Sequence, residues 1–504
     1  MLGCPAAEIV DRLPDRLHEG ILRWADETPD ATAVVGTSHS LTYAELDAAV
    51  RDCRESLTAL GVRRGDRVMI VSENGPSLMV LVLALSGLDG VAAIINARLS
   101  AREIELIEAD CKPRLVLYTV SDSAEAKTQA AARATRTLAL RTGTLEATEV
   151  SDVEPEQAGE SPVEQVLAMI YTTGTTGKPK GVMLTHRNLT FIAFVSGRLR
   201  GIRAGEAIYC VLPMSHVFGL SAVSCSVLFA GGAVHLVPRF DARAVLDALV
   251  SEQIVGFLGV PAMYGGMLEA LDGERFFAPS LRFFYSGGSP LDPDIKRRVE
   301  ETFGLPLHNG YGLTESGPTI CQTRLYAPLE NTSVGFVLPG VEVRIRDDEG
   351  NDVPAGEVGE LWARGPNIMK GYFGQPEMTA AVLQDGWLNT GDLVRLDDAG
   401  SINIAGRTKE LIIRSGFNVY PPEVEGVLSD HPDVSIAAVV GRERDGNEEI
   451  VAFIQPVAGR SINVDSLLAF ARERLAGYKV PNRVEIRPEL PAAPSGKILK
   501  HQLN

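Results

Sequence analysis

The sequence predicts an α/β fold in two parts, a large N-terminal domain of layered β-sheets with covering helices and a small C-terminal α+β domain. Apolar, strand-like runs alternate with helical patterns through most of the chain, which is typical of sheets that carry helices on their faces. The 504 residues are also too many for a single hydrophobic core. We therefore expect one domain over residues 1–406 and a second over residues 407–504.

The N-terminal part of the chain shows this alternation first. Thr42 and Glu45 form a capping box that predicts the start of a helix, and apolar residues recur at steps of three and four until Gly61 ends it. Residues 67–71 predict a strand, and helix and strand alternate to about residue 118. The polar stretch 121–162 predicts an excursion on the surface.

Apolar runs in the middle of the chain predict further strands, separated by helical patterns, at residues 207–213, 235–238, 255–260 and 283–286. Two longer apolar stretches, 78–97 and 217–234, approach the length of a membrane span. Asp89 and Gly90 interrupt the first, and two glycines interrupt the second. We interpret each stretch as a buried helix followed by a buried strand.

The composition changes near Arg407, where a glycine- and aspartate-rich stretch ends. The residues that follow have their own strand-like runs, 435–440 and 450–456, and a helical pattern around Leu467. They predict a small second domain that a short hinge joins to the first.

Charge and composition exclude several classes of partner. The chain is 45% hydrophobic and carries a net charge of −17, so it has no basic footprint for nucleic acid, and we expect a small-molecule partner. Its six cysteines show no metal-binding or paired spacing, which suits reduced thiols in a cytoplasmic protein. The first residues lack a basic segment followed by an apolar one, so we expect no signal peptide.

The ten residues 172–181, TTGTTGKPKG, follow a strand-like run at 166–171 and are typical of a loop that binds phosphate. Glycines let the backbone turn sharply and approach a ligand, while hydroxyls, backbone N–H groups and lysine converge on anionic oxygens. It is not a Walker A loop, because only two residues separate Gly174 from Gly177 and Pro179 follows Lys178. A flexible linker is the alternative.

Four further motifs accompany this loop: LPMSHVFG at 212–219, GYGLTES at 310–316, GWLNTGDL at 386–393 with GRTKELIIRSGFNVYPPEVE at 406–425, and PAAPSGKILK at 491–500. In this order the chain resembles the acyl-adenylate-forming superfamily, in its acyl- and aryl-CoA synthetase branch, and the resemblance covers nearly the whole length. The motif YGLTESGP is similar to that of hydroxycinnamate ligases. The resemblance implies the adenylate-forming fold with a mobile C-terminal domain.

The resemblance also implies a reaction that uses ATP, Mg²⁺ and coenzyme A. A carboxylate attacks the α-phosphate of ATP, pyrophosphate leaves, and a thiol then attacks the acyl-adenylate. Bringing two anions together demands positioning and charge neutralisation. Thr314 would bond the α-phosphate and Glu315 would hold Mg²⁺, although both could simply begin a helix after a turn. The β- and γ-phosphates would be held by Thr172, Thr173, Gly174, Thr175, Thr176 and Lys178.

The nucleoside contacts follow from the same motifs. Asp392 would accept both ribose hydroxyls, unless it is only a turn aspartate, and Arg407 would reach the ribose or a phosphate. Tyr311, with Gly312 beside it, would stack against the adenine. The loop along the adenine would consist of Gly287, Gly288, Ser289 and Pro290.

The resemblance also implies roles for three residues of the C-terminal part. Lys497 would reach both the carboxylate and the α-phosphate during adenylation, although an exposed lysine is usually only solvated. Lys409 would be the hinge, and Gly416 would let the pantetheine chain of CoA pass the backbone. Acetylation of Lys497 would remove its charge, so an acetyltransferase and a deacetylase are candidate partners.

In this superfamily, the adenylation domains of peptide synthetases generally carry an aspartate in the corresponding motif to bind an amino group. LPMSHVFG offers His216 and no acid, so the resemblance implies a free carboxylic acid rather than an amino acid. His216 would sit between the carboxylate and the thiol, although a lone histidine is more often a satisfied core residue. Proximity to the motifs suggests an apolar acid pocket lined by Phe191, Phe218, Val260, Pro261, Tyr264, Tyr285 and Gly317.

We therefore expect a cytoplasmic acid:CoA ligase that acts on an aryl or medium-chain acid, with a homodimer as one option for its assembly. One alternative is an adenylating enzyme that makes no CoA thioester, such as a luciferase-like enzyme or a ligase that loads a carrier protein. The other is an inactive sensor of acyl nucleotides.

Overall fold

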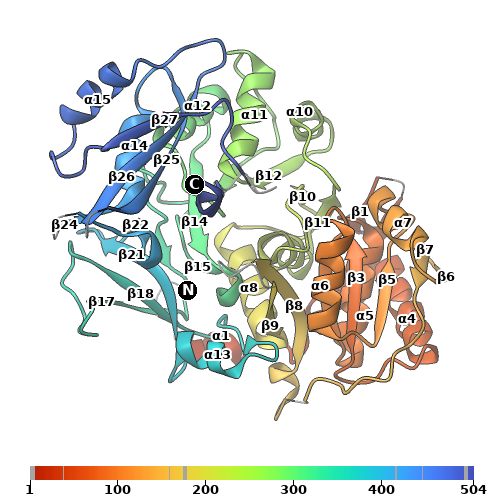
Figure 1. Cartoon of the computed structure of the whole chain (residues 1–504). Helices are drawn as coiled ribbons and strands as arrows, with labels where there is room; N and C mark the ends of the chain where they lie inside the picture. Colours follow the sequence, from red (N-terminus) through yellow and green to blue (C-terminus); the bar gives the residue numbers. More distant parts are fainter. Residues whose placement is uncertain are drawn as a thin grey trace.

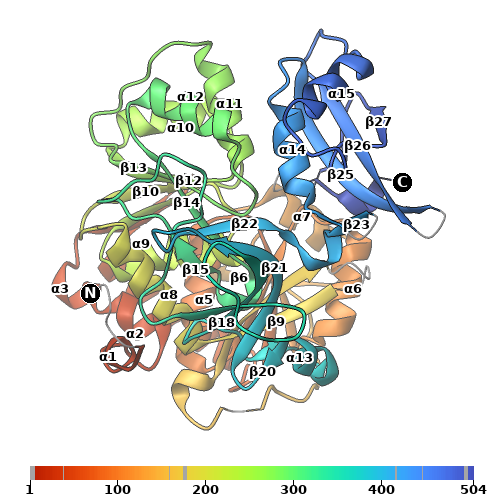
Figure 2. The ribbon, with the colours of Figure 1, turned by 90° about the vertical axis from the view of Figure 1, so that its left-hand side faces the viewer.

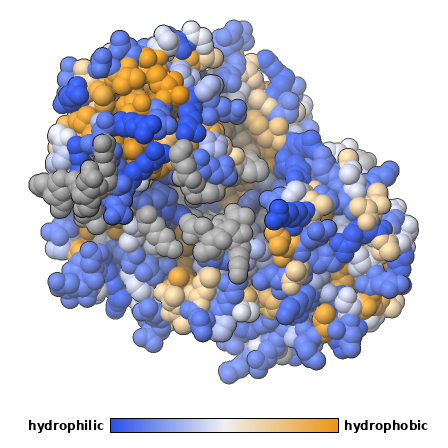
Figure 3. Space-filling view, viewed as in Figure 1, coloured by the Kyte–Doolittle hydropathy of each residue, from blue (hydrophilic) through white to orange (hydrophobic). Residues whose placement is uncertain are grey.

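The computed structural model describes residues 6–37, 39–157, 159–173, 179–414, 417–444, 447–492 and 498–503. Three β-sheets build the part of the chain up to Arg407, and two small sheets follow it (Figures 1 and 2). Hydrophilic side chains cover most of the face in Figure 3, whereas apolar side chains gather over the C-terminal sheet, where Ile486 is 44% exposed.

The first sheet has eight strands in the order β19-β9-β8-β4-β3-β5-β7-β6. Its centre is parallel, because β3 pairs with β4 and β5 and β4 pairs with β8, and its edges are antiparallel. The bounds are β3 Arg67–Ser72, β4 Val91–Asn96, β5 Leu115–Tyr118, β6 Arg136–Leu140, β7 Gly143–Ala147, β8 Val166–Thr173, β9 Pro179–Thr185 and β19 Gly371–Tyr372.

The second sheet has nine strands in the order β16-β15-β14-β13-β12-β10-β11-β1-β2. The run from β14 to β1 is parallel, so the carboxyl ends of these strands meet at one edge. The bounds are β1 Thr32–Val35, β2 Ser40–Thr42, β10 Ala207–Cys210, β11 Ala233–Leu236, β12 Ile254–Gly259, β13 Phe283–Ser286, β14 Leu307–Gly312, β15 Thr319–Gln322 and β16 Phe336–Val337.

Helices join these two sheets and cover their outer faces. One core cluster contains buried residues of both sheets and of α4 (Tyr43–Ala59), α5 (Pro76–Leu88), α8 (His186–Leu199) and α9 (Ser226–Phe229), so these helices lie between the sheets. The outer faces are covered by α6 (Ala101–Cys111) and α7 (Ala124–Ala131) on the first sheet, and by α10 (Ala242–Ser251), α11 (Pro261–Leu271) and α12 (Pro293–Phe303) on the second.

A third, antiparallel sheet precedes the C-terminal part. It consists of β17 (Glu342–Arg346), β18 (Val358–Arg364), β20 (Leu383–Gln384), β21 (Trp387–Leu396) and β22 (Ile402–Arg407), and α13 (Pro376–Val382) lies beside it.

The strands after Arg407 pair only with one another among the described residues. One pair is β23 (Ile412–Arg414) with β24 (Phe417–Val419), and the other sheet is β25 (Val434–Arg444), β26 (Asn447–Pro456) and β27 (Arg483–Ile486). They share a core of their own with α14 (Pro421–Ser429) and α15 (Val464–Arg472). The division at 406/407 stays a prediction.

Most local expectations are confirmed. The capping box of Thr42 and Glu45 begins α4, and both long apolar stretches form a buried helix followed by a strand. The second stretch begins with a π-helix, Phe218–Cys225 (η2), before α9. Among the described helices, none has the length and apolarity to cross a membrane.

The expectation of a surface excursion over 121–162 is wrong for its first half. That half forms α7, β6 and β7, which extend the first sheet beyond β5. Four buried side chains are responsible: Ala126 and Ala130 pack α7 against the sheet, and Leu145 and Ala147 bury one face of β7. A polar composition conceals these few buried positions.

Tyr43 offers a test of how α4 is tied to α9 and to the segment that leads into β11. Its buried hydroxyl lies 2.8 Å from the Gly232 carbonyl and 3.1 Å from the Leu228 carbonyl. Tyr43→Phe should cost about 1–2 kcal/mol, because a buried hydrogen bond is lost. The check is the melting temperature by circular dichroism, with Tyr326→Phe, at a residue 65% exposed, as control. Equal melting temperatures for both variants would contradict the tie.

Candidate active site

The candidate site lies at the edge of the second sheet where the parallel strands end. His216 follows β10, Val260 follows β12, Gly287 follows β13 and Gly312 ends β14. Because these strands are neighbours, residues that are far apart in the sequence meet at one edge. Open α/β sheets bind their ligands outside the carboxyl ends of the strands.

The loop after β13 brings backbone close to this edge. A Cβ atom on Gly287 would lie 3.1 Å from the ring of Phe218, and Gly288 has a left-handed φ of +81°. Gly288 and Pro290 are exposed and Ser289 is half-buried. A bare, accessible stretch of backbone of this kind can lie along a flat ligand such as a base.

Asp392, on β21, is held by two partners from different sheets. The Tyr311 hydroxyl, at the end of β14, donates to Oδ2, and the Arg407 guanidinium, at the end of β22, pairs with Oδ1 at 2.8 Å. The Asp392 side chain is only 4% exposed. Burial and the Asp392 charge raise the pKa of Tyr311 well above its usual value, so the phenol keeps its proton and remains a donor.

Glu315 lies in a short 3₁₀ turn, Thr314–Ser316, and Tyr372 on β19 fixes its carboxylate. The Tyr372 hydroxyl donates to Oε1 at 2.7 Å, and no described residue bonds Oε2. Burial, with Glu315 second, raises the pKa of Tyr372, so this phenol also stays a donor. The Lys180 ammonium lies 5.4 Å from the centre of the Tyr372 ring and adds positive charge.

The Glu315 carboxylate is the kind of oxygen ligand that Mg²⁺ takes when substrate phosphates supply the rest. Among the described residues, no group of three His, Cys, Asp or Glu side chains could hold a metal alone. These observations fit a magnesium ion that arrives with a nucleotide.

The turn around Thr314 is tightly packed. A Cβ atom on Gly312 would lie 1.7 Å from the Pro318 carbonyl, so only glycine fits there. The buried Asn367 amide donates to the Ser316 and Thr319 carbonyls at 3.0 Å each, which fixes the end of the turn and the start of β15. Neither Tyr372 nor Asn367 belongs to a motif that the sequence singled out.

Part of the expected phosphate loop is described. Thr172 and Thr173 end β8 and pair with Lys180 and Pro179 of β9. Lys409 lies in a 3₁₀ turn, Thr408–Glu410, directly after the last strand of the third sheet. Other predicted residues lie outside the described residues: Gly174, Thr175, Thr176, Lys178, Gly416 and Lys497.

His216 is exposed to solvent, yet protein atoms surround it on most sides. This desolvation, with the positive charge of Arg98 as second cause, lowers the pKa of the imidazole. The ring is therefore neutral at neutral pH and can accept a proton. Arg98, at the end of β4, belongs to no motif, so the sequence did not identify it.

The structure brings some of the expected pocket residues together. Phe218 lies against Gly287, and Val260 lies 3.6 Å from where a Cβ atom on Gly288 would be. Pro261 is buried at the start of α11, and Gly317 is buried with a φ of +73°. The acid pocket itself stays a prediction.

Tyr285 is also buried near this edge, and its hydroxyl donates to the Thr323 carbonyl at 2.8 Å. The Arg200 guanidinium lies 5.2 Å from the centre of its ring.

Two of the expected pocket residues need correction. Tyr264 lies on the opposite face of the second sheet from Tyr285, in the core with Phe257 and Phe284, and is wholly buried. Tyr264 belongs to α11, which packs on the outer face of this sheet, so adjacency to a motif does not decide the face that a side chain joins. Phe191 is wholly buried between the sheets, 3.2 Å from where a Cβ atom on Gly340 would be.

Comparison with known proteins identifies the family to which this chain belongs. The model of the AMP-binding enzyme family matches residues 21–373, and that of the AMP-binding enzyme C-terminal domain matches residues 423–497. Feruloyl-CoA synthase from Amycolatopsis sp. is 37% identical, over 96% of this chain and 99% of that protein. A 2-succinylbenzoate–CoA ligase of Bacillus cereus is 35% identical, over 94% of this chain and 95% of that protein.

A solved structure agrees. The o-succinylbenzoate coenzyme A synthetase of Bacillus subtilis, in complex with ATP and magnesium ion, superposes with a TM-score of 0.81 at 30% identity, over 96% of this chain and 98% of that one. The resemblance inferred from the motifs is thereby confirmed. The chain belongs to the family of AMP-binding enzymes, in its acyl- and aryl-CoA synthetase branch.

Proposed function

We propose that this protein is an AMP-forming ligase that joins an aryl carboxylic acid to coenzyme A. The observation that carries the proposal is the meeting of three groups at one sheet edge: the bare Gly287–Gly288 loop, the Tyr311–Asp392–Arg407 cluster and the Tyr372-bound Glu315. Relatives named for ferulate and 2-succinylbenzoate favour an aryl acid over a medium-chain one.

The nucleoside is held by three groups in this account. Asp392 accepts hydrogen bonds from the ribose hydroxyls, and Arg407 and Tyr311 orient its carboxylate. The Gly287–Pro290 backbone lies along the adenine, with the Tyr311 ring against it. A nucleotide bound in this way would direct its α-phosphate toward Thr314.

In the first half-reaction, a carboxylate oxygen bonds to the α-phosphorus and the bond to the β-phosphate oxygen breaks, which releases pyrophosphate. Thr172, Thr173 and the rest of the loop through Lys178 hold the leaving phosphates, and Lys497 neutralises the approaching anions. Magnesium, when bound at Glu315, spreads the developing charge. Tyr372 orients the carboxylate for that task.

In the second half-reaction, the neutral His216 accepts the proton of the CoA thiol as sulfur bonds to the carbonyl carbon. The bond from that carbon to the phosphate oxygen breaks, and AMP leaves. The C-terminal domain turns about Lys409 between the two halves, so that Gly416 replaces Lys497 at the site.

Three further properties belong to this proposal. Acetylation of Lys497 would stop adenylation by removing its charge. The five described cysteines are all buried and free, which favours the cytoplasm. A homodimer is also proposed, and sedimentation would decide it.

One assay tests the function. The protein is incubated with ATP, Mg²⁺ and a panel of aryl and medium-chain acids, with and without CoA, and AMP and thioester are measured. Both products with an aryl acid support the proposal. AMP without thioester would favour an adenylating enzyme of another kind, and neither product would favour a sensor.

Glu315→Gln should slow adenylation through the metal. Losing the carboxylate charge should cost a few kcal/mol of transition-state stabilisation, on the order of a hundredfold in rate. The measurement is acid-dependent AMP formation across magnesium concentrations, with Glu377→Gln, an exposed glutamate of α13, as control. Equal rates at limiting Mg²⁺ would show that Glu315 does not hold the metal.

Lys409→Pro should slow thioester formation more than adenylation. Proline fixes φ, so it restricts the rotation of the C-terminal domain about residue 409. That rotation follows adenylation and is required for thioester formation. Each half is measured separately, as pyrophosphate release and as thioester formation from synthetic acyl-AMP. Equal slowing of both halves would place the hinge elsewhere.

Lys497→Ala should slow adenylation and spare thioester formation, which is the opposite of the effect expected for Lys409→Pro. Adenylation should fall by orders of magnitude, because its charge is needed only as carboxylate and α-phosphate approach. Supplied acyl-AMP should still react with CoA at close to the parental rate. Lys127→Ala, at an exposed lysine of α7, is the control. A variant inactive in both halves would refute the two-state account.

A further inference from the structure

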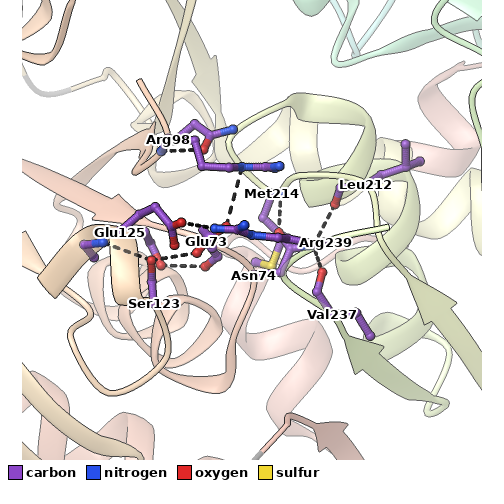
Figure 4. A network of polar contacts seen from close by, with 12 residues as sticks. Glu73, Asn74, Arg98, Ser123, Glu125, Leu212, Met214, Val237 and Arg239 are labelled. Carbon is purple, nitrogen blue, oxygen red and sulfur yellow. Dashed lines mark hydrogen bonds and ion pairs between the residues drawn. The ribbon is translucent and has the colours of Figure 1, made fainter. Parts of the chain in front are cut away.

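Asn74 lies two residues after the end of β3 in the first sheet, but its side chain bonds the loop that leads to His216. The amide nitrogen Nδ2 donates to the Leu212 carbonyl at 2.9 Å and to the Val237 carbonyl at 3.1 Å (Figure 4). The amide oxygen Oδ1 accepts from the Met214 N–H at 2.8 Å. One side chain, only 4% exposed, thus ties the ends of β10 and β11 to the end of β3.

Among the described residues, few other hydrogen bonds fix the loop from residue 211 to His216. Asn74 is the only described acceptor for the Met214 N–H. The His216 N–H then donates to the Pro213 carbonyl at 3.0 Å, which closes the turn that presents the imidazole. On the far side, Gly219 packs so closely that a Cβ atom would lie 2.4 Å from the Leu212 carbonyl.

The neighbouring Glu73 keeps Asn74 in place. Its carboxylate, 3% exposed, accepts from Ser123 at 2.9 Å and pairs with Arg98 at 3.5 Å and Arg239 at 3.4 Å (Figure 4). Arg239 also pairs with Glu125 on α7. Residues 73 and 74 are thereby fixed to β4, α7 and the end of β11 at once.

We propose that Asn74 is a positioning residue that fixes the 211–215 loop so that the imidazole of His216 faces the reacting carbonyl and thiol. The inference rests on the proposed function, and on the part of it that assigns proton acceptance to His216. The Asn74 amide bonds backbone groups of the loop and of the end of β11, so it acts through His216. The nucleotide contacts lie on β14, β21 and β22, so its loss should leave them intact.

The test is a double-mutant cycle on thioester formation from synthetic aryl-acyl-AMP and CoA under single-turnover conditions. Asn74→Ala should lower the rate about 10- to 100-fold, as expected for a displaced catalytic group, with little change in the KM for ATP in the full reaction. In a His216→Ala background the same change should cost less than about threefold, because the two residues act as one unit. If Asn74→Ala folds poorly, Asn74→Ser replaces it.

Thr119→Val is the matched control. It removes a buried 2.7 Å hydrogen bond between Thr119 and Ser72 near the end of β3, without touching the His216 loop. It should lower the melting temperature as Asn74→Ala does but leave the rate close to parental.

Three outcomes would overturn the proposal: equal slowing by Asn74→Ala with and without His216, equal slowing by Thr119→Val, or no effect of His216→Ala on thioester formation. Failure of the proposed function looks different, because the parent itself then forms no thioester. In that case the NMR resonance of the His216 imidazole provides the test. It is identified as the resonance that is missing from His216→Ala. Asn74→Ala should shift or split this resonance, and an unchanged resonance would refute the positioning role.

Discussion

The structure depends most on the buried charge of Asp392 and the two groups that stabilise it. A carboxylate that is 4% exposed is costly to ionise unless it is paired and hydrogen-bonded, and Arg407 and the Tyr311 hydroxyl supply both. Tyr311 belongs to the second sheet, whereas Asp392 and Arg407 belong to the third. The same cluster therefore fixes the two sheets together and orients the carboxylate that we propose as the ribose acceptor.

The position of this cluster in the chain also matters. Arg407 ends β22, and the turn with Lys409 follows immediately, so the last fixed residue before the proposed hinge contacts the proposed nucleotide site. A site at this junction can remain in place while the C-terminal part changes orientation. Asn74 does the corresponding work for His216, by tying the first sheet to the loop after β10. Asp392 and the His216 loop thus each receive at least one positioning contact from a different sheet.

Local patterns predicted much of the fold and of the site. Capping residues, apolar runs and glycine loops are short-range signals, which explains why α4, β3, β12 and β13 and the loop after β13 are found where they were expected. Contacts between distant residues left no such signal. Tyr372 and Glu315 are separated by 57 residues, and Asn74 and Met214 by 140. Tyr264 was misplaced for a related reason, since proximity to a motif does not tell which face of a sheet a side chain joins.

The central claim is that Asp392, held by Tyr311 and Arg407, anchors the ribose of the adenylate. The direct measurement is calorimetric binding of an aryl-acyl sulfamoyl-adenosine, which mimics the acyl-adenylate, and of its 2′,3′-dideoxy analogue. The parent should bind the dideoxy compound at least about tenfold more weakly, since hydrogen bonds to a charged group are lost. Asp392→Ala should bind both compounds with equal affinity. A parent that does not discriminate between them, or an Asp392→Ala variant that still does, would contradict the account.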